Sequence, residues 1–169
     1  MENAKPKITT FFMFEGKAEE AMNFYITLFD RSEIISMQHY GPNEAGAEGT
    51  VVQALFSLNG QVFMCIDSSV KHNFTFTPSM SLYVTCDTDA EIDRVFGRLS
   101  DGGFVLMPLG AYPFSEKFGW VQDKFGVSWQ LNFDKKYPGR TALDQGSGGC
   151  PNVKKFLQIK VKGCQEPPQ

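Results

Sequence analysis

The side chains that could do chemistry in this sequence are few and widely spaced. There are two histidines, His39 and His72, and four cysteines. The cysteines, at positions 65, 86, 150 and 164, have no Cys-x-x-Cys spacing and no neighbouring histidine, so neither a zinc site nor a disulfide framework is predicted. Strand alternation places Cys65 and Cys86 on the side of a sheet that packs against a helix, which predicts inert core thiols.

Other catalytic motifs are also missing. No Gly-rich loop of the kind that cradles a nucleotide-like cofactor joins a strand to a helix, and there is no Gly-x-Ser-x-Gly nucleophile elbow. Asp67 and Asp87 end strands at equivalent places in the two halves of the chain, and we interpret them as strand-terminal or capping residues rather than a carboxylate pair. Both histidines fall near or within loops, where a solvated ring is the expected state.

The elements that must position these residues follow from hydrophobic periodicity. Helical spacing of apolar residues predicts helices over 17–29 and 89–100, the second capped by Thr88. A loop rich in Pro, Gly and aromatic residues is expected over 108–114, and hairpins are expected around Asn59-Gly60 and over 123–126. Strands are predicted over 8–14, 32–40, 51–58, 61–67, 81–86, 104–107, 118–122 and 127–133.

The order of these elements repeats. Each half reads βαβββ, so the fold class is α+β with two modules, at about 7–68 and 79–134, within one domain over 1–134. Shifting the sequence by 71 residues lays the apolar stripe of the first helix onto that of the second.

Composition bounds the function further. The chain has 169 residues, of which 42% are hydrophobic and 21% charged, with a formal net charge of -3. This balance argues against a nucleic-acid-binding face.

No apolar run reaches the roughly 18–20 residues of a membrane span, and the first residues do not resemble a secretory signal, so we expect a cytoplasmic protein without membrane association. Aromatic residues make up 14%, sixteen of them Phe, which predicts an aromatic core and an aromatic-lined cavity.

The last part of the chain differs in charge. Residues 1–134 carry nine Lys or Arg against 17 Asp or Glu, whereas residues 135–169 carry seven against two. This basic segment contains several Gly and Pro residues and reads as a tail. Alternation over 157–162 is compatible with one added strand, and extra sequence without a functional role is the equally weighted alternative.

Seven segments of the chain together form a recognisable pattern: 14–21 (FEGKAEEA), 24–25 (FY), 49–51 (GTV), 58–61 (LNGQ), 76–78 (FTP), 118–123 (FGWVQD) and 125–131 (FGVSWQL). With these segments the chain resembles the vicinal-oxygen-chelate superfamily, which has the glyoxalase and bleomycin-resistance fold, and within it the PhnB-like branch. The resemblance covers about residues 7–134. It implies that each module curls into half of an open, incomplete barrel around a cavity, with the helices outside, and that two chains form a homodimer.

The resemblance raises the question of a metal. Members of the superfamily hold a divalent ion with His, Glu or Gln on inward positions of the first, fourth, fifth and eighth strands. The matching positions here are about Thr10, about Met64, about Ser81 and Gln130. Only Gln130 is a suitable ligand, because hydroxyls are poor neutral donors and a thioether suits Cu(I). The prediction is therefore no metal and no cofactor, which disfavours glyoxalase and extradiol dioxygenase chemistry.

Strand alternation predicts which side chains line the cavity. Ser128, Gln130 and Asn132 share the inward face of the last strand, while Trp129 and Leu131 pack under the helix. The lining is mostly apolar and aromatic with a few hydroxyls and amides, which is typical of small-molecule pockets. A concavity filled by its own side chains is the alternative. The predicted cavity residues are Thr10, Phe12, Phe14, Met64, Ser81, Tyr83, Tyr112, Trp120, Ser128 and Gln130.

Three functions are compatible with these observations. The favoured hypothesis is a metal-independent binding protein for a small apolar or aromatic molecule, rather than an enzyme. The second is a lyase, isomerase or dioxygenase that holds a metal in an atypical way through Gln130. The third is a homodimeric interaction protein without a ligand. PhnB-like sequences are often labelled demethylubiquinone methyltransferases, and no motif in this sequence supports that activity.

Overall fold

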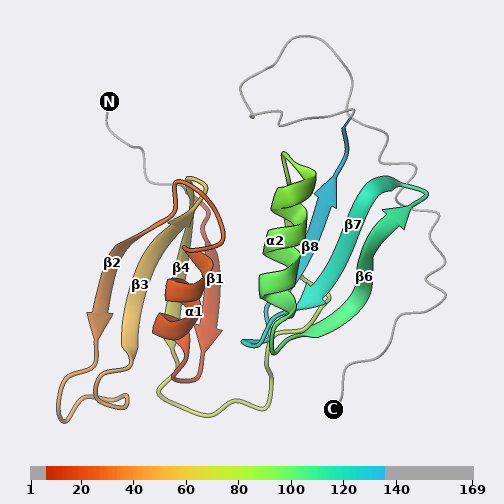
Figure 1. Ribbon diagram of the computed structural model, residues 1–169. Coiled ribbons are helices and arrows are strands. Elements are labelled where there is room, and N and C mark those ends of the chain that lie inside the picture. The colour runs from red at the N-terminus through yellow and green to blue at the C-terminus, as the bar shows by residue number, and fades with distance from the viewer. Residues whose placement is uncertain (1–6, 136–169) are drawn as a thin grey trace. The chain divides into compact units, whose positions relative to one another are not determined.

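The computed structural model describes residues 7–135, and the chain divides into two compact units between Phe74 and Thr75. Within residues 7–135, each unit contains one helix and one four-stranded sheet (Figure 1). The predicted basic tail lies outside the described residues from position 136 onward. The first unit contains β1 (Thr10–Phe14), α1 (Ala18–Tyr25), β2 (Glu33–His39), β3 (Val51–Leu58) and β4 (Gln61–Asp67). The second contains β5 (Ser81–Thr85), α2 (Asp89–Ser100), β6 (Phe104–Tyr112), β7 (Ser115–Gln122) and β8 (Ser128–Phe133).

The two sheets share one topology. Their strand orders are β1-β4-β3-β2 and β5-β8-β7-β6, so in each unit the first strand pairs in parallel with the last and the other pairs are antiparallel. This confirms the βαβββ repeat and the α+β class. Neither described helix has the length and apolar character needed to cross a membrane.

Asp67, at the end of β4, positions α1. Its carboxylate is 3% exposed, and it accepts a hydrogen bond from Ala18 N at 3.0 Å through Oδ1 and another from Val51 N at 3.0 Å through Oδ2. Lys17, directly before the helix, provides no side-chain cap. A buried carboxylate therefore satisfies the first turn of α1 and ties it to the start of β3, which confirms the capping role predicted for Asp67.

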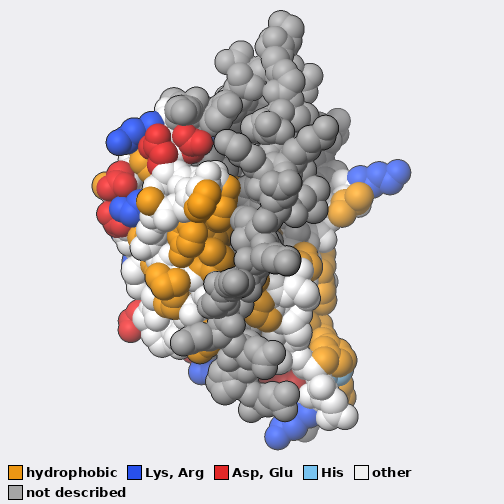
Figure 2. All heavy atoms as spheres, turned by 90° about the vertical axis from the view of Figure 1, so that its right-hand side faces the viewer, with side chains coloured by type: hydrophobic (Ala, Val, Ile, Leu, Met, Phe, Trp, Pro, Cys, Tyr) orange, Lys and Arg blue, Asp and Glu red, His pale blue; other side chains and the backbone are white. Residues whose placement is uncertain are grey.

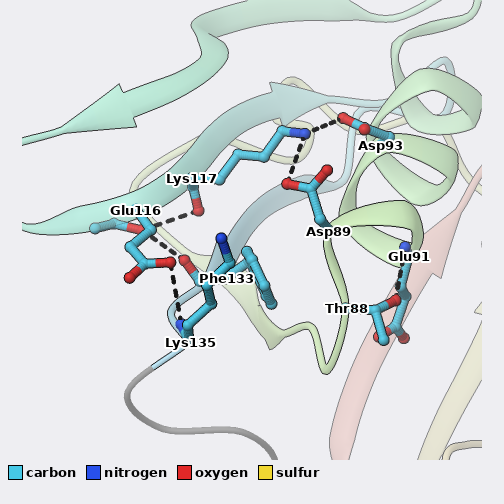
Figure 3. Close-up of polar contacts among 9 residues, drawn as sticks. Thr88, Asp89, Glu91, Asp93, Glu116, Lys117, Phe133 and Lys135 are labelled. Atoms are coloured by element: carbon cyan, nitrogen blue, oxygen red, sulfur yellow. Dashed lines mark hydrogen bonds and ion pairs between the residues drawn. The ribbon is translucent and has the colours of Figure 1, made fainter.

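The helix of the second unit is capped locally and braced by an ion-pair cluster. Thr88 Oγ1 accepts a hydrogen bond from Glu91 N at 3.1 Å. On β7, Lys117 Nζ lies 2.6 Å from Asp93 and 3.1 Å from Asp89, both on α2 (Figure 3). These carboxylates raise the pKa of Lys117. The apolar stripe of α2 is buried against β6, β7 and β8.

Several predicted boundaries were wrong, including the start of β7, which is Ser115 rather than Phe118. The first helix ends at Tyr25 rather than Phe29, because the chain tightens into turns in which Thr27 N and Leu28 N donate to carbonyls three residues back. The loop expected over 108–114 is largely strand, since β6 continues to Tyr112. β6 is an edge strand with three register shifts, which is where a sheet tolerates Pro108.

Candidate functional site

The most distinctive group of polar side chains lies on the second sheet, on the face opposite α2. We call it the helix-free face. Register places one residue from each strand in each of three rows across this face, and every residue in the rows is uncharged. The rows are Ser81–Ser128–Gln122–Phe104, Tyr83–Gln130–Trp120–Met107 and Thr85–Asn132–Phe118–Gly110.

Alternation along β8 decides which side chains reach this face. Trp129 and Leu131 are at most 1% exposed and belong to the core beneath α2, whereas Gln130 and Asn132 are only half-buried. The predicted division of β8 between two faces is therefore confirmed. The same register brings together five predicted cavity residues: Ser81, Tyr83, Trp120, Ser128 and Gln130.

Four of these side chains form one hydrogen-bond network. Trp120 Nε1 donates to Ser128 Oγ at 2.8 Å, and Ser128 Oγ lies 2.7 Å from Ser81 Oγ. Gln130 Nε2 donates to Ser81 Oγ at 3.2 Å, and the Ser81 hydroxyl points to the Pro78 carbonyl at 3.5 Å. The network fixes the rotamers of an indole and an amide at the centre of the face, as preorganised binding sites require.

The electrostatics of this face are neutral. Tyr83 is 47% exposed, and the partial burial of its side chain, with a smaller contribution from Cys86, raises its pKa to about 12. A tyrosine hydroxyl is protonated at neutral pH even without such a shift. Two acidic residues lie one alternation step beyond the third row: Glu116, near the start of β7, and Asp134, directly after β8. An anion is therefore disfavoured at that end of the face, whereas a neutral molecule incurs no charge penalty.

Tyr112 extends the aromatic character of this sheet along β6. Its ring stacks on Phe114 with centroids 5.5 Å apart and meets Phe118 edge-on at 5.9 Å. Figure 2, which looks toward the β6 and β7 side of the second unit, shows hydrophobic side chains left of the centre and along the right of the view, with most charged side chains toward its margins.

The first sheet corrects the predicted cavity lining. β1 runs parallel to β4 with Phe12 opposite Cys65 and Phe14 opposite Asp67, so both phenylalanines share the face that carries α1. Phe12 stacks on Phe63 with centroids 5.8 Å apart. Phe12 and Phe14 are 5% and 4% exposed, and assigning them to the same face as Met64 was wrong.

Met64 does lie on the face opposite α1, but its partner in register is Phe11, not Thr10. Thr10 pairs with Phe63 on the helix side. Phe11 is 50% exposed and was missed, because five consecutive residues of β1 offer no polar–apolar alternation to choose between its faces. The exposed phenylalanine, rather than the threonine, accompanies Met64.

The residues present do not fit the metal that the fold family implies. Thr10 and Met64 point to opposite faces of the first sheet, so they cannot converge on one ion. Ser81 and Gln130 are hydrogen-bonded to each other. Within residues 7–135, no three His, Cys, Asp or Glu side chains group together as metal ligands would.

The histidines and cysteines lie elsewhere. His39 Nε2 is 3.0 Å from Glu19 Oε2, and His72 Nε2 is 2.8 Å from Ser68 Oγ. Cys65 and Cys86 are buried free thiols, and burial raises the pKa of each to about 12, with further contributions from nearby carboxylates, so neither is a thiolate nucleophile.

A surface groove of about 640 Å³ lies in the first unit, at the end of β2. It is formed by Gln38, His39, Tyr40, Glu44, Ala45 and Val52. None of these residues belongs to the predicted lining. His39 already has Glu19 as a partner, and Glu44 accepts a hydrogen bond from Gly41 N.

Two βαβββ units, each with a helix on one face of a four-stranded sheet, define the glyoxalase/bleomycin-resistance class of folds. A glyoxylase/bleomycin resistance protein/dioxygenase domain from Frankia sp. EAN1pec shares this fold, with a TM-score of 0.55 at 12% identity over 79% of this chain and 95% of that one. The model of the family described as 3-demethylubiquinone-9 3-methyltransferase matches residues 6–132. The chain belongs to this PhnB-like family.

Solved structures support the same assignment. A PhnB protein from Bacillus cereus is 69% identical, with a TM-score of 0.75, over 76% of this chain and 99% of that one. A protein from Pseudomonas aeruginosa is 26% identical, with a TM-score of 0.68, over 77% of this chain and 98% of that one. No curated protein matches the chain.

Proposed function

We propose that this protein binds a small apolar or aromatic molecule on the helix-free face of the second sheet, without a metal. The observation that carries the proposal is the central row, in which Gln130 stands between Tyr83 and Trp120 and is held by Ser81. Aromatic side chains beside a few fixed polar groups are typical of small-molecule sites.

Metal independence rests on the donor set. The four positions that would supply ligands hold two hydroxyls, a thioether and one amide, and the register keeps Thr10 and Met64 apart. The methyl transfer in the family's description is not part of the proposal, because residues 7–135 contain no Gly-rich strand-to-helix loop for a nucleotide-like methyl donor.

The two tryptophans provide a direct test, since they lie on opposite faces of one sheet. We would titrate 2-naphthol into ¹⁵N-labelled protein with EDTA present and follow both indole N–H signals by NMR. The Trp120 signal should move and the buried Trp129 signal should stay in place. The same titration after incubation with Zn²⁺ and Mn²⁺ should give an unchanged Kd.

Two results would contradict the proposal. If neither indole signal moves up to the solubility limit of 2-naphthol, the helix-free face does not bind aromatic molecules. If binding disappears in EDTA and returns with a metal, the second hypothesis, a metal-dependent site at Gln130, replaces this one.

A further inference from the structure

The hydrogen-bond network on the helix-free face has fixed donors at Trp120 and Gln130. An indole N–H can only donate, so Ser128 Oγ is the acceptor for Trp120. Ser128 Oγ lies 2.7 Å from Ser81 Oγ, where either hydroxyl can be the donor, and the Ser81 hydroxyl also lies 3.5 Å from the Pro78 carbonyl oxygen. In either arrangement Ser81 Oγ keeps a lone pair with which it accepts a hydrogen bond from the Gln130 amide.

The hydrogen bond to Ser81 determines what Gln130 presents to a ligand. Its Nε2 is engaged with Ser81, and among the described residues Oε1 accepts no hydrogen bond. Because the amide is planar, holding Nε2 against Ser81 turns the carbonyl oxygen away from Ser81. The central polar group of the face is therefore an acceptor in need of a donor.

The surroundings restrict the ligand further. Tyr83 and Trp120 flank Gln130 in register, one on each neighbouring strand. Neighbouring strands lie roughly 4.8 Å apart, so the two aromatic side chains stand within reach of one planar ring placed over Gln130. The three rows contain no cation to pair with an anionic ligand, and the acidic residues 116 and 134 stand at one end.

From these observations we infer that the ligand is an uncharged planar aromatic molecule carrying an O–H or N–H group, a phenol or an aromatic amine, which donates to Gln130 Oε1. This inference rests on the proposed function, because it assigns the ligand class of the same face. Ser81 is a positioning residue in this arrangement, since it holds the amide but need not touch the ligand.

Three probes of one shape separate the possibilities: 2-naphthol, which donates; 2-methoxynaphthalene, which cannot; and 2-naphthoate, which is anionic. Calorimetric titration of the full chain should give a Kd for 2-naphthol about tenfold lower than for the methyl ether, with 2-naphthoate weakest. The comparison is stringent, because the ether is the more apolar molecule and would bind better by burial alone.

Variants identify the acceptor. Gln130→Met keeps the length of the side chain and removes the amide, so the tenfold preference should fall to about one. Gln61→Met is the matched control, because Gln61 is an exposed residue of the first sheet, and it should leave the preference unchanged. Ser81→Ala frees the amide to turn over, which should reduce the preference for 2-naphthol without abolishing binding.

Each outcome has a separate meaning. Equal affinity of the wild-type protein for 2-naphthol and its ether would overturn the inference and leave the proposed function standing. Tighter binding of 2-naphthoate would do the same. A preference that survives in Gln130→Met would remove Gln130 as the acceptor. No binding of any probe would refute the proposed function itself, and the inference with it.

Discussion

The buried carboxylate of Asp67 should be a main support of the first unit, and Asp67→Asn tests this. α1 has only eight residues and no side-chain cap of its own, so Asp67 is the group that satisfies Ala18 N. The second carboxylate oxygen satisfies Val51 N in a buried position. An asparagine can accept from one of these donors but turns its own NH₂ toward the other.

The expected cost follows from these contacts. A buried donor that loses its partner costs about 1–3 kcal/mol, and bonds to a charged acceptor lie in the upper part of that range. Asp67→Asn should therefore destabilise the first unit by about 2–3 kcal/mol, and Asp67→Ala, which loses both acceptors, by about 3–5 kcal/mol. Asp87→Asn is the control, because it makes the same chemical change at an exposed position between β5 and α2 of the second unit.

Hydrogen exchange is the appropriate assay, since both tryptophans report only on the second unit. Amides of α1 should exchange roughly 30- to 150-fold faster in Asp67→Asn, which is 2–3 kcal/mol converted at 1.4 kcal/mol per factor of ten. Urea unfolding followed by tryptophan fluorescence would show whether the second unit unfolds with the first. If exchange in α1 is no faster than in Asp87→Asn, the reasoning that this carboxylate holds the helix is refuted.

Two further predictions concern the core. The pKa of both buried thiols is raised from 9.0 to about 12, so the stability they contribute is present below pH 9 and is lost as the pH rises toward 12. Cys65→Ala and Cys86→Ala should each flatten the fall in unfolding free energy above pH 9 by up to about 1.4 kcal/mol per pH unit, and a slope unchanged in both would contradict these shifts. Gly119→Ala should destabilise by about 1–3 kcal/mol in urea unfolding, because its Cβ would collide with the Phe96 ring of α2. Gly110→Ala, which meets only open space, is the control, and equal midpoints for the two variants would argue against the close packing of β7 on α2.

Much of the architecture could be predicted because its local signals agree. The bounds of α2 were predicted as 89–100 and match, since Thr88 caps one end and Gly102, with a φ of +69°, follows the other. The hairpin at Asn59-Gly60 also forms, with positive φ at both residues. The loop predicted over 108–114 from its Pro, Gly and aromatic residues was wrong, because the place of Pro108 on the edge strand β6 depends on strand order, which sequence does not show.

The faces of the strands at the candidate site were predicted correctly for β8 and wrongly for β1. β8 alternates strictly between polar and apolar residues, so only one assignment of faces buries Trp129 and Leu131. β1 has no such alternation, and a shift of one residue moves every side chain to the other face. What decides between the two registers is the parallel pairing with β4, a contact with a strand about 50 residues further along the chain.

This difference between the strands bears on function. Polar side chains that are partly buried on a sheet need hydrogen-bond partners. On β8 the neighbouring strands provide them, because Gln130 donates to Ser81 and Ser128 accepts from Trp120. The first sheet has no comparable network beside Met64, whose partner in register is the exposed Phe11. The two modules share a topology but differ on the faces opposite their helices. On the face of the second module, the hydrogen bond to Ser81 holds the Gln130 amide in one orientation. If a single module carries recognition, substitutions at Gln130 should change which ligand binds, whereas Phe11→Leu, in the first unit, should leave the affinity for all three naphthalene probes unchanged.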